Sequence, residues 1–185
     1  MVLIAICGIS GAGKSTLINF ATSNLSNLSN MIPVTNRPPR PMEQNGVDRF
    51  FLNAQQIQQL EEKNQLCLIN EVYCYKYAYF AHDFQGTTPK FIEIHHKCLC
   101  QLKSVYPQYI SVCIEPIDIL ITRELLLNRQ TSRSESNIRI QQLENDAHEI
   151  DLLKLNRQFN YVFINDYSER AKMRFLSLIK SILEC

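Results

Sequence analysis

Short apolar runs alternate with amphipathic stretches along the chain. The runs are almost wholly apolar, as expected of strands buried on both faces, and they occupy residues 2–7, 91–94, 108–114 and 160–164. The amphipathic stretches repeat at helical spacing and predict helices over residues 96–105, 117–128, 140–155 and 168–183, the last of them capped by Ser168. This alternation predicts an α/β fold with a mostly parallel sheet.

The segment between the first two of these runs departs from the alternation. It predicts a short strand at residues 31–34, a polar helix at residues 54–64 and, from its tyrosine and β-branched residues, a hairpin at residues 66–80. Alternate positions of the hairpin carry tyrosines that share one face: Tyr73, Tyr75, Tyr77 and Tyr79. That face either packs against the core or lines a pocket with hydroxyl groups, for which Tyr79 is the best candidate.

Length and composition are typical of one soluble globular domain. The chain has 185 residues, 45% of them hydrophobic and 20% charged, and a net charge of +1. No broad basic field favours nucleic acid or an anionic membrane, and no apolar run approaches the ~20 residues of a membrane span. Seven cysteines, several of them in predicted strands, indicate buried thiols and a cytoplasmic location.

One group of cysteines suggests a metal site as an alternative. Cys98 and Cys100 lie beside His95 and His96. Their spacing is not that of the usual zinc sites and no second cysteine pair follows, so packing is the favoured interpretation.

The strongest motif follows the first apolar run directly. Residues 8–15 fit G-x-x-x-x-G-K-[ST], a loop whose N–H groups cradle nucleotide phosphates. In this motif Lys14 reaches the β- and γ-phosphates and the Ser15 hydroxyl binds Mg²⁺, while a helix beginning at Lys14 adds the positive end of its dipole. A plain glycine-rich turn would not explain a lysine followed by a hydroxyl. We therefore predict nucleotide binding by Gly8, Ser10, Gly11, Ala12, Gly13, Lys14, Ser15 and Thr16.

Two further stretches concentrate arginine. Arg37 and Arg40 lie on a stiff, proline-rich path, where planar guanidinium groups suit bidentate binding of a phosphate. A basic surface loop is the plainer interpretation of that stretch alone. A later segment predicts a flap that closes over transferring phosphates, although a solvated helical hairpin would also explain its arginines: Arg123, Arg129, Arg133 and Arg139.

The order of these motifs resembles the guanylate kinase family over nearly the whole chain. Residues 8–17 are similar to that family's phosphate loop, residues 123–146 to its arginine-bearing lid, and residues 159–166 to its F-D-Y-V-I-V-N-D segment. The more specific likeness is to the acceptor-binding signature, carried here by Thr35-Asn-Arg-Pro-Pro-Arg-Pro with Glu43, Gly46, Asp48 and Phe50-Phe51.

This resemblance implies a phosphate-loop (P-loop) NTPase fold with three α/β/α layers in a single domain of residues 1–185. Its parts would be a core of residues 1–34, 90–122 and 140–185, an acceptor-binding β subdomain of residues 35–89 and a helical lid of residues 123–139. The resemblance also implies residue roles. Arg37, Arg40 and Tyr79 would hold the acceptor phosphate, and Asn165 would lie near the adenine. The catalytic set would be Lys14, Arg37, Arg129 and Arg139, the last two closing on the transferring group.

The guanine-reading positions depart from the family. Arg49 stands where the family has a tyrosine, Ala81 lacks a hydroxyl, and the family's I-D-I-D ends here in His95. Asn70 and His95 cannot supply the two carboxylates that would accept from guanine, and Glu71 replaces one of them only if a bulge moves it into place. The expected acceptor contacts are Arg37, Arg40, Glu43, Glu71, Tyr79 and His95. We expect weaker discrimination between monophosphates and a pH dependence from His95, whose ordinary pKa is about 6.5.

The predicted reaction moves the γ-phosphoryl group of ATP onto a nucleoside monophosphate, with GMP as the first choice. The predicted cofactors are ATP and Mg²⁺, with Ser15 and Glu93 at the ion. One alternative is a kinase for another phosphorylated metabolite, such as ribose 1,5-bisphosphate. The other is a catalytically weak guanylate-kinase-like binding module, against which the intact Gly13, Lys14 and Ser15 argue. We expect small-molecule partners, no nucleic acid or membrane, and a monomer or weak homodimer.

Overall fold

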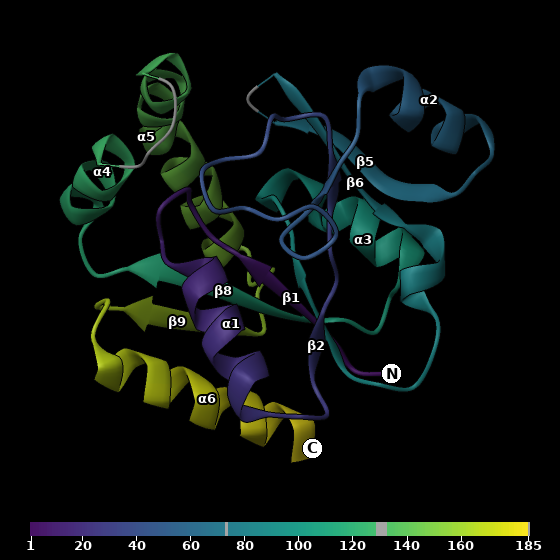
Figure 1. Cartoon of the computed structure of the whole chain (residues 1–185). Helices are drawn as coiled ribbons and strands as arrows, with labels where there is room; N and C mark the ends of the chain where they lie inside the picture. Colours follow the sequence, from purple (N-terminus) through teal and green to yellow (C-terminus); the bar gives the residue numbers. More distant parts are fainter. Residues whose placement is uncertain (73, 129–132, 185) are drawn as a thin grey trace.

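A five-stranded parallel sheet forms the centre of the fold (Figure 1). The computed structural model describes residues 1–72, 74–128 and 133–184, with the backbone alone for residues 133–136. The strand order is β2-β7-β1-β8-β9, and all its pairings are parallel. The strands are β1 (Leu3–Cys7), β2 (Ser29–Asn30), β7 (Lys90–Glu93), β8 (Ile110–Pro116) and β9 (Tyr161–Asn165). The predicted α/β fold is confirmed.

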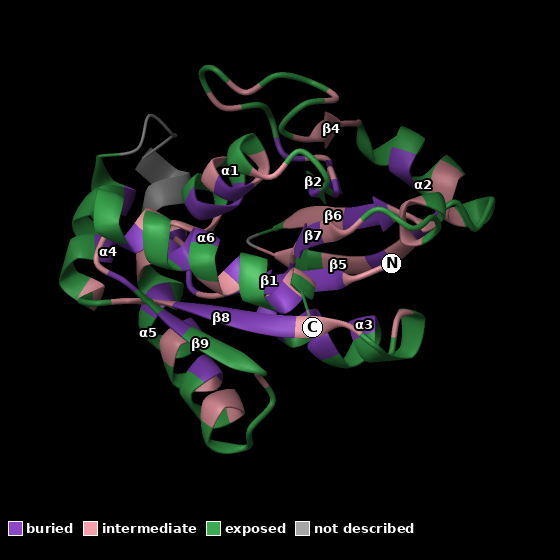
Figure 2. Cartoon of the chain, turned by 90° about the horizontal axis from the view of Figure 1, so that it is seen from below, coloured by how far each residue is buried: buried purple, intermediate pink, exposed green. Residues whose placement is uncertain are grey.

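Helices cover both faces of this sheet. Alternate residues of its central strand, β1, point to opposite sides and pack against different helices. Ile4 and Ile6 pack into a core with α1 (Lys14–Asn24) and α6 (Glu169–Glu184), whereas Leu3 and Ala5 pack with α3 (Leu99–Val105). Figure 2 shows how fully β1 and β8 are buried between these layers. The predicted cap of the last helix is confirmed, since Ser168 Oγ accepts from the N–H of Ala171 at 3.0 Å.

A second, four-stranded sheet stands beside the parallel one (Figure 1), in the order β4-β3-β6-β5. The predicted hairpin is confirmed as the antiparallel pair of β5 and β6. Helix α2 joins β4 to β5 and begins with a capping box of Asn53 and Gln56. The elements of this part are β3 (Val34–Thr35), β4 (Phe50–Phe51), α2 (Ala54–Glu62), β5 (Leu66–Val72), β6 (Tyr75–Phe80) and the 3₁₀ turn η1 (Ala81–Phe84).

The predicted strand at residues 31–34 is wrong. Ser29–Asn30 forms an edge of the parallel sheet and Val34–Thr35 belongs to the second sheet, so the chain passes from one sheet to the other between them. Pro33, which lies in this passage, has no N–H to donate to a strand partner. Its carbonyl instead accepts from the N–H of Phe50 at 2.9 Å.

Two helices follow β8, α4 (Ile119–Leu127) and α5 (Arg133–Leu155), and the 3₁₀ turn η2 (His96–Cys98) precedes α3. Asp118 caps α4 by accepting from the N–H of Leu120 at 2.8 Å. The predicted lid covers the end of α4 and the start of α5, together with residues 129–132, which lie outside the described residues. The division into core, subdomain and lid stays a prediction. Within the described residues, none of the helices has the length and apolar character needed to cross a membrane.

Candidate active site

The phosphate loop connects β1 to α1 at the carboxyl end of the parallel sheet. Gly8 and Gly13 have φ angles of +147° and +86°. A Cβ added to Gly8 would lie 2.4 Å from the carbonyl oxygen of Ile114, and one added to Gly13 would lie 2.4 Å from Asn165 Nδ2. Only glycine therefore fits at these two turns. The first turn of α1 carries no acidic residue, so the positive end of its dipole is available to an anion.

Two residues at the end of β9 and just beyond it, Asn165 and Tyr167, support the loop from behind. Asn165 Nδ2 donates to the carbonyl of Ala12 at 2.8 Å, and the Tyr167 hydroxyl donates to the carbonyl of Gly11 at 3.2 Å. Asn165 and Ala12 are buried, and neither lines the cavity that the rest of the loop faces. Both residues therefore support the loop in this structure, and their predicted contacts with a nucleotide stay predictions.

Lys14 and Ser15 meet the end of β7. Lys14 Nζ donates to the carbonyls of Gly8 and Ile9 at 2.9 and 3.0 Å and lies 3.7 Å from Glu93 Oε1. Ser15 Oγ donates to Glu93 Oε2 at 3.1 Å. Because β7 is the parallel neighbour of β1, its last residue reaches the start of α1. The two residues predicted at the ion, Ser15 and Glu93, are therefore adjacent.

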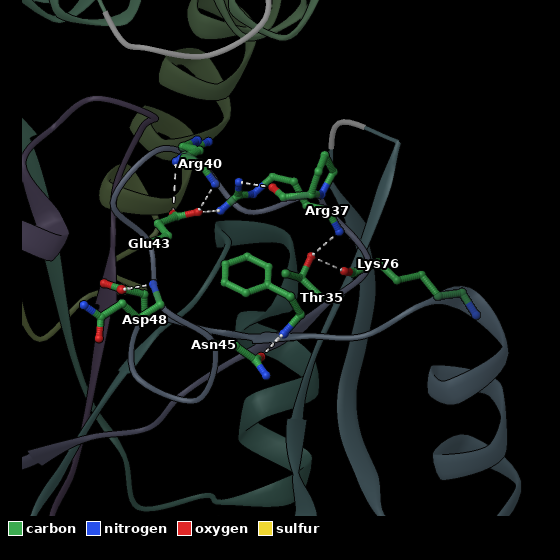
Figure 3. A network of polar contacts seen from close by, with 10 residues as sticks. Thr35, Arg37, Arg40, Glu43, Asn45, Asp48 and Lys76 are labelled. Carbon is green, nitrogen blue, oxygen red and sulfur yellow. Dashed lines mark hydrogen bonds and ion pairs between the residues drawn. The ribbon is translucent and has the colours of Figure 1, made fainter.

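Glu43 joins the two arginines of the predicted acceptor site (Figure 3). Arg37 Nη2 lies 2.8 Å from both carboxylate oxygens, and the backbone N–H of Arg40 donates to Oε2 at 2.7 Å. Arg37 is only 2% exposed, and Thr35 Oγ1 accepts from its N–H while donating to the carbonyl of Lys76. Burial opposes the charge of Glu43, but the bonds from Arg40 and Arg37 outweigh it and hold the pKa of Glu43 below its ordinary value.

One cavity of about 290 Å³ joins the phosphate loop to these arginines. Its walls come from the loop, the proline-rich segment, the hairpin, the end of β7 and α5. The predicted site residues that line it are Gly8, Ser10, Gly11, Gly13, Lys14, Ser15, Thr16, Arg37, Arg40, Glu43, Tyr79, Glu93, His95 and Arg139. The fold thus brings the residues predicted to bind the phosphoryl donor and those predicted to bind the phosphoryl acceptor into one cavity.

A bulge in β5 decides which hairpin residue faces this cavity. Cys67 pairs with Tyr79 and Asn70 with Tyr77, so two residues of β5 oppose one of β6. The bulge directs Asn70 to the cavity wall and leaves Glu71 exposed. The Glu71 side chain thus lies outside the cavity wall in this structure, and its predicted acceptor contact stays a prediction. Asn70 Oδ1 is buried with no hydrogen-bond partner among the described residues.

Two other predicted acceptor contacts have properties that the sequence did not show. Burial, aided by the charges of His96 and Lys14, lowers the pKa of His95 to about 3. The predicted pH dependence from His95 is therefore wrong, because its imidazole stays neutral through the physiological range. The Tyr79 hydroxyl donates to the carbonyl of Glu93, and burial together with the charge of Glu93 raises its pKa.

The start of α5 brings one lid arginine onto the loop. Arg139 is 7% exposed, and its Nη1 donates to Ser10 Oγ at 3.0 Å. Arg123 is exposed on α4. The predicted role of Arg129 falls outside the described residues.

The sequence marks Arg49 only as a departure from the family pattern. In the structure Arg49 is half-buried and lines the cavity, and its guanidinium carbon lies 5.6 Å from the centroid of the Tyr77 ring. No described carboxylate forms an ion pair with it. The sequence signal that could have placed Arg49 at the cavity was its position directly before the aromatic pair of the acceptor signature. The support that Tyr167 gives the loop had no such signal.

Comparison with known families matches the guanylate kinase family model over residues 1–181. The chain belongs to the guanylate kinase family. A guanylate kinase of Bacteroides thetaiotaomicron is 31% identical over 98% of this chain and 89% of its own length, and one of Thermotoga maritima is 26% identical over 97% and 86%. The crystal structure of guanylate kinase from Anaplasma phagocytophilum has the same fold, with a TM-score of 0.74 at 17% identity over 97% of this chain and 85% of its own.

These matches confirm the resemblance drawn from the sequence motifs. They also confirm the P-loop NTPase type of fold and the enzyme class, a nucleoside monophosphate kinase. The roles of the individual site residues stay predictions, which the geometry described above supports.

Proposed function

We propose that this protein transfers the γ-phosphoryl group of ATP to the phosphate of GMP. The observation that carries the proposal is the single cavity whose walls hold both the phosphate loop with Lys14 and the pair Arg37 and Arg40. Phosphoryl transfer needs little covalent chemistry from the protein, because the acceptor oxygen itself attacks. A space that holds two phosphate sites in reach of each other supplies the positioning that the reaction requires.

The donor side fits ATP and Mg²⁺. The loop glycines let backbone N–H groups approach the phosphates, and Lys14 lies at the mouth of the loop. The Ser15 hydroxyl and the Glu93 carboxylate, 3.1 Å apart, form the oxygen ligand set that Mg²⁺ prefers, so these two residues would hold the ion, Ser15 directly. When bound, Mg²⁺ neutralises charge on the phosphate oxygens.

On the acceptor side, Glu43 fixes the guanidinium of Arg37 and the backbone of Arg40, so the clamp is ordered before the acceptor arrives. Arg139, held by Ser10 beside the loop, is placed to stabilise charge on the transferring group. Each of these groups acts through position and charge.

Acceptor-dependent release of ADP tests the proposal. With GMP and ATP the protein should turn over, and Lys14→Ala should abolish transfer while circular dichroism shows an intact fold. Lys172→Ala, in α6 and outside the cavity, is the matched control and should retain activity. ATP and GMP binding without acceptor-dependent turnover would instead favour the binding-module alternative.

A specific observation supports a second acceptor class. The cavity presents Asn70 and neutral His95 where carboxylates would read guanine, and it adds the guanidinium of Arg49, which has no ion pair with a carboxylate of the described residues. These groups favour a phosphorylated acceptor recognised more by charge than by its base, such as ribose 1,5-bisphosphate. Steady-state kinetics with GMP, AMP, UMP, CMP and ribose 1,5-bisphosphate separates the two. A strong preference for GMP that Arg49→Tyr leaves unchanged would exclude the second class.

A further inference from the structure

A group of side chains of metal-binding types lines the cavity and lies outside the phosphate loop motif. His95 and His96 follow β7, and Asp146 lies in α5. One ligand atom from each of the three lies within 4.8 Å of the others. The His95 and His96 rings are 4.2 Å apart between centroids, and His96 and Asp146 are only 5% and 6% exposed. Of the three, only His95 has a place in the phosphoryl transfer derived above, as an expected contact of the acceptor.

The chemistry of the three side chains is that of a transition-metal site. Imidazole nitrogens with one carboxylate suit Zn²⁺ and other first-row divalent ions, whereas Mg²⁺ prefers oxygen ligands alone. The cysteines that first suggested a metal here do not take part. Cys98 is buried in the apolar core under α3, and Cys100 is exposed. Asp146, about fifty positions further along the chain, takes their place.

A fourth residue supports one of the imidazoles. Glu149 Oε2 pairs with His96 Nε2, and Glu149 is in turn held by Lys97 Nζ at 3.2 Å. A carboxylate on one nitrogen of a histidine fixes the ring and raises the basicity of the other nitrogen, an arrangement that recurs around metal-bound histidines. Glu149 lies one helical turn beyond Asp146, so α5 supplies both the ligand and the support.

We propose that His95, His96 and Asp146 bind one divalent transition-metal ion of the Zn²⁺ class, with an open coordination position that faces the cavity. Bonds of about 2.0–2.2 Å in a tetrahedral site bring ligand atoms to about 3.4 Å from each other. Side-chain rotation at Asp146 and the imidazoles covers the remaining distance. The bound ion would tie α5 to the end of β7, across the wall that an acceptor occupies. This site goes beyond the proposed function and does not depend on it.

Binding of Zn²⁺ and Co²⁺ to the full chain, in excess Mg²⁺, tests the proposal. Calorimetry should show one equivalent bound, and Co²⁺ should give visible bands of nitrogen and oxygen coordination. His96→Ala and Asp146→Asn should each weaken binding at least ten-fold. Glu149→Gln should weaken it about ten-fold while keeping the stoichiometry, as expected for a group that supports a ligand. His82→Ala, exposed and not among the residues that line the cavity, is the control and should bind as the unmodified protein does.

Several results would overturn the proposal. They are a lack of binding, binding unchanged in both His96→Ala and Asp146→Asn, or thiolate bands with Co²⁺, which would place the ion on the cysteines. Thermal unfolding followed by circular dichroism checks that each variant folds. Should His96→Ala fail to fold, His95→Ala replaces it with the same ten-fold criterion. Because the readout is metal binding, a failed kinase assay leaves this test intact.

Discussion

The guanidinium group of Arg37 is largely held by hydrogen bonds within the protein before any ligand binds. Its Nη1 donates to the carbonyl of Pro38 at 2.7 Å, its Nη2 to Glu43, and its Nε is buried with no hydrogen-bond partner among the described residues. A buried guanidinium that still has a donor to satisfy is suited to an anion. The planar fork, and not charge alone, makes this geometry possible.

We predict that Arg37→Lys and Arg40→Lys each lower acceptor affinity by about ten-fold or more, which corresponds to at least about 1.4 kcal/mol. Affinity for an ATP analogue should change little, because the phosphate loop is untouched. Calorimetry with GMP and with the analogue measures both. Arg170→Lys, exposed on α6, is the control. A loss confined to the ATP analogue would contradict the assignment.

A second prediction concerns Glu43 and pH. Its pKa is lower in the folded chain than its ordinary value of 4.5, so its contribution to stability is complete above about pH 4.5 and is lost as the pH falls through the folded value. Glu43→Gln should therefore lower the free energy of unfolding by about 2 kcal/mol at pH 7, and by less at about pH 3.

Urea unfolding at both pH values measures this difference. Glu124→Gln, an exposed carboxylate on α4, is the control. A difference of the same size at both pH values would show that Glu43 stabilises the fold through shape and not through its charge.

At the scale of residues, the sequence predicted the site residues whose positions are fixed by their neighbours in the chain. Lys14 and Ser15 could be assigned because a motif fixes their position relative to the loop. Glu71 could not, because a bulge at Leu68, with φ of +52°, turns Asn70 toward the cavity in its place. Nothing in a non-glycine residue such as Leu68 signals that conformation.

The phosphate loop shows the same contrast between local and distant information at the scale of an element. The order strand, loop and helix was predictable, because the apolar run, the glycines and the start of α1 are contiguous. The hydrogen bond by which Asn165 braces the loop was not predictable, because Asn165 lies more than 150 positions away along the chain. The short strands β2 and β3 were also misassigned, since two residues carry too little periodicity to reveal which sheet they join.

The brace itself leads to a third prediction. Asn165→Ala removes the donor to the carbonyl of Ala12 and should lower the free energy of unfolding by about 1–3 kcal/mol. Affinity for an ATP analogue should fall as well, because the loop loses support directly behind Gly13. Asn165→Asp should be at least as damaging, since a carboxylate cannot donate to a carbonyl. Denaturation and calorimetry on the two variants test this, and an aspartate variant equal to the unmodified protein would refute it.

At the scale of the whole molecule, the two sheets meet where the proposed donor and acceptor sites meet. Tyr79 and Leu68 of the hairpin share an apolar cluster with Ile92 and Ile94 around β7. The Tyr79 hydroxyl is bonded to the carbonyl of Glu93, and the Glu93 carboxylate contacts Ser15. Motif order alone predicted that both sites exist, but only packing of the two sheets shows this connection.

That connection predicts communication between the two sites. Tyr79→Phe keeps the ring in the apolar cluster and removes only the hydroxyl, so the free energy of unfolding should fall by about 1 kcal/mol. The larger effect should be on coupling. Without the hydrogen bond from Tyr79, the end of β7 should respond less to changes in the hairpin. The ratio of GMP affinities measured with and without an ATP analogue should therefore move toward one. Tyr75→Phe, on the same strand but outside the cavity, is the control. If Tyr79 instead serves only as a contact to the acceptor phosphate, GMP affinity will fall equally in the presence and absence of the analogue and the ratio will stay as it is in the unmodified protein.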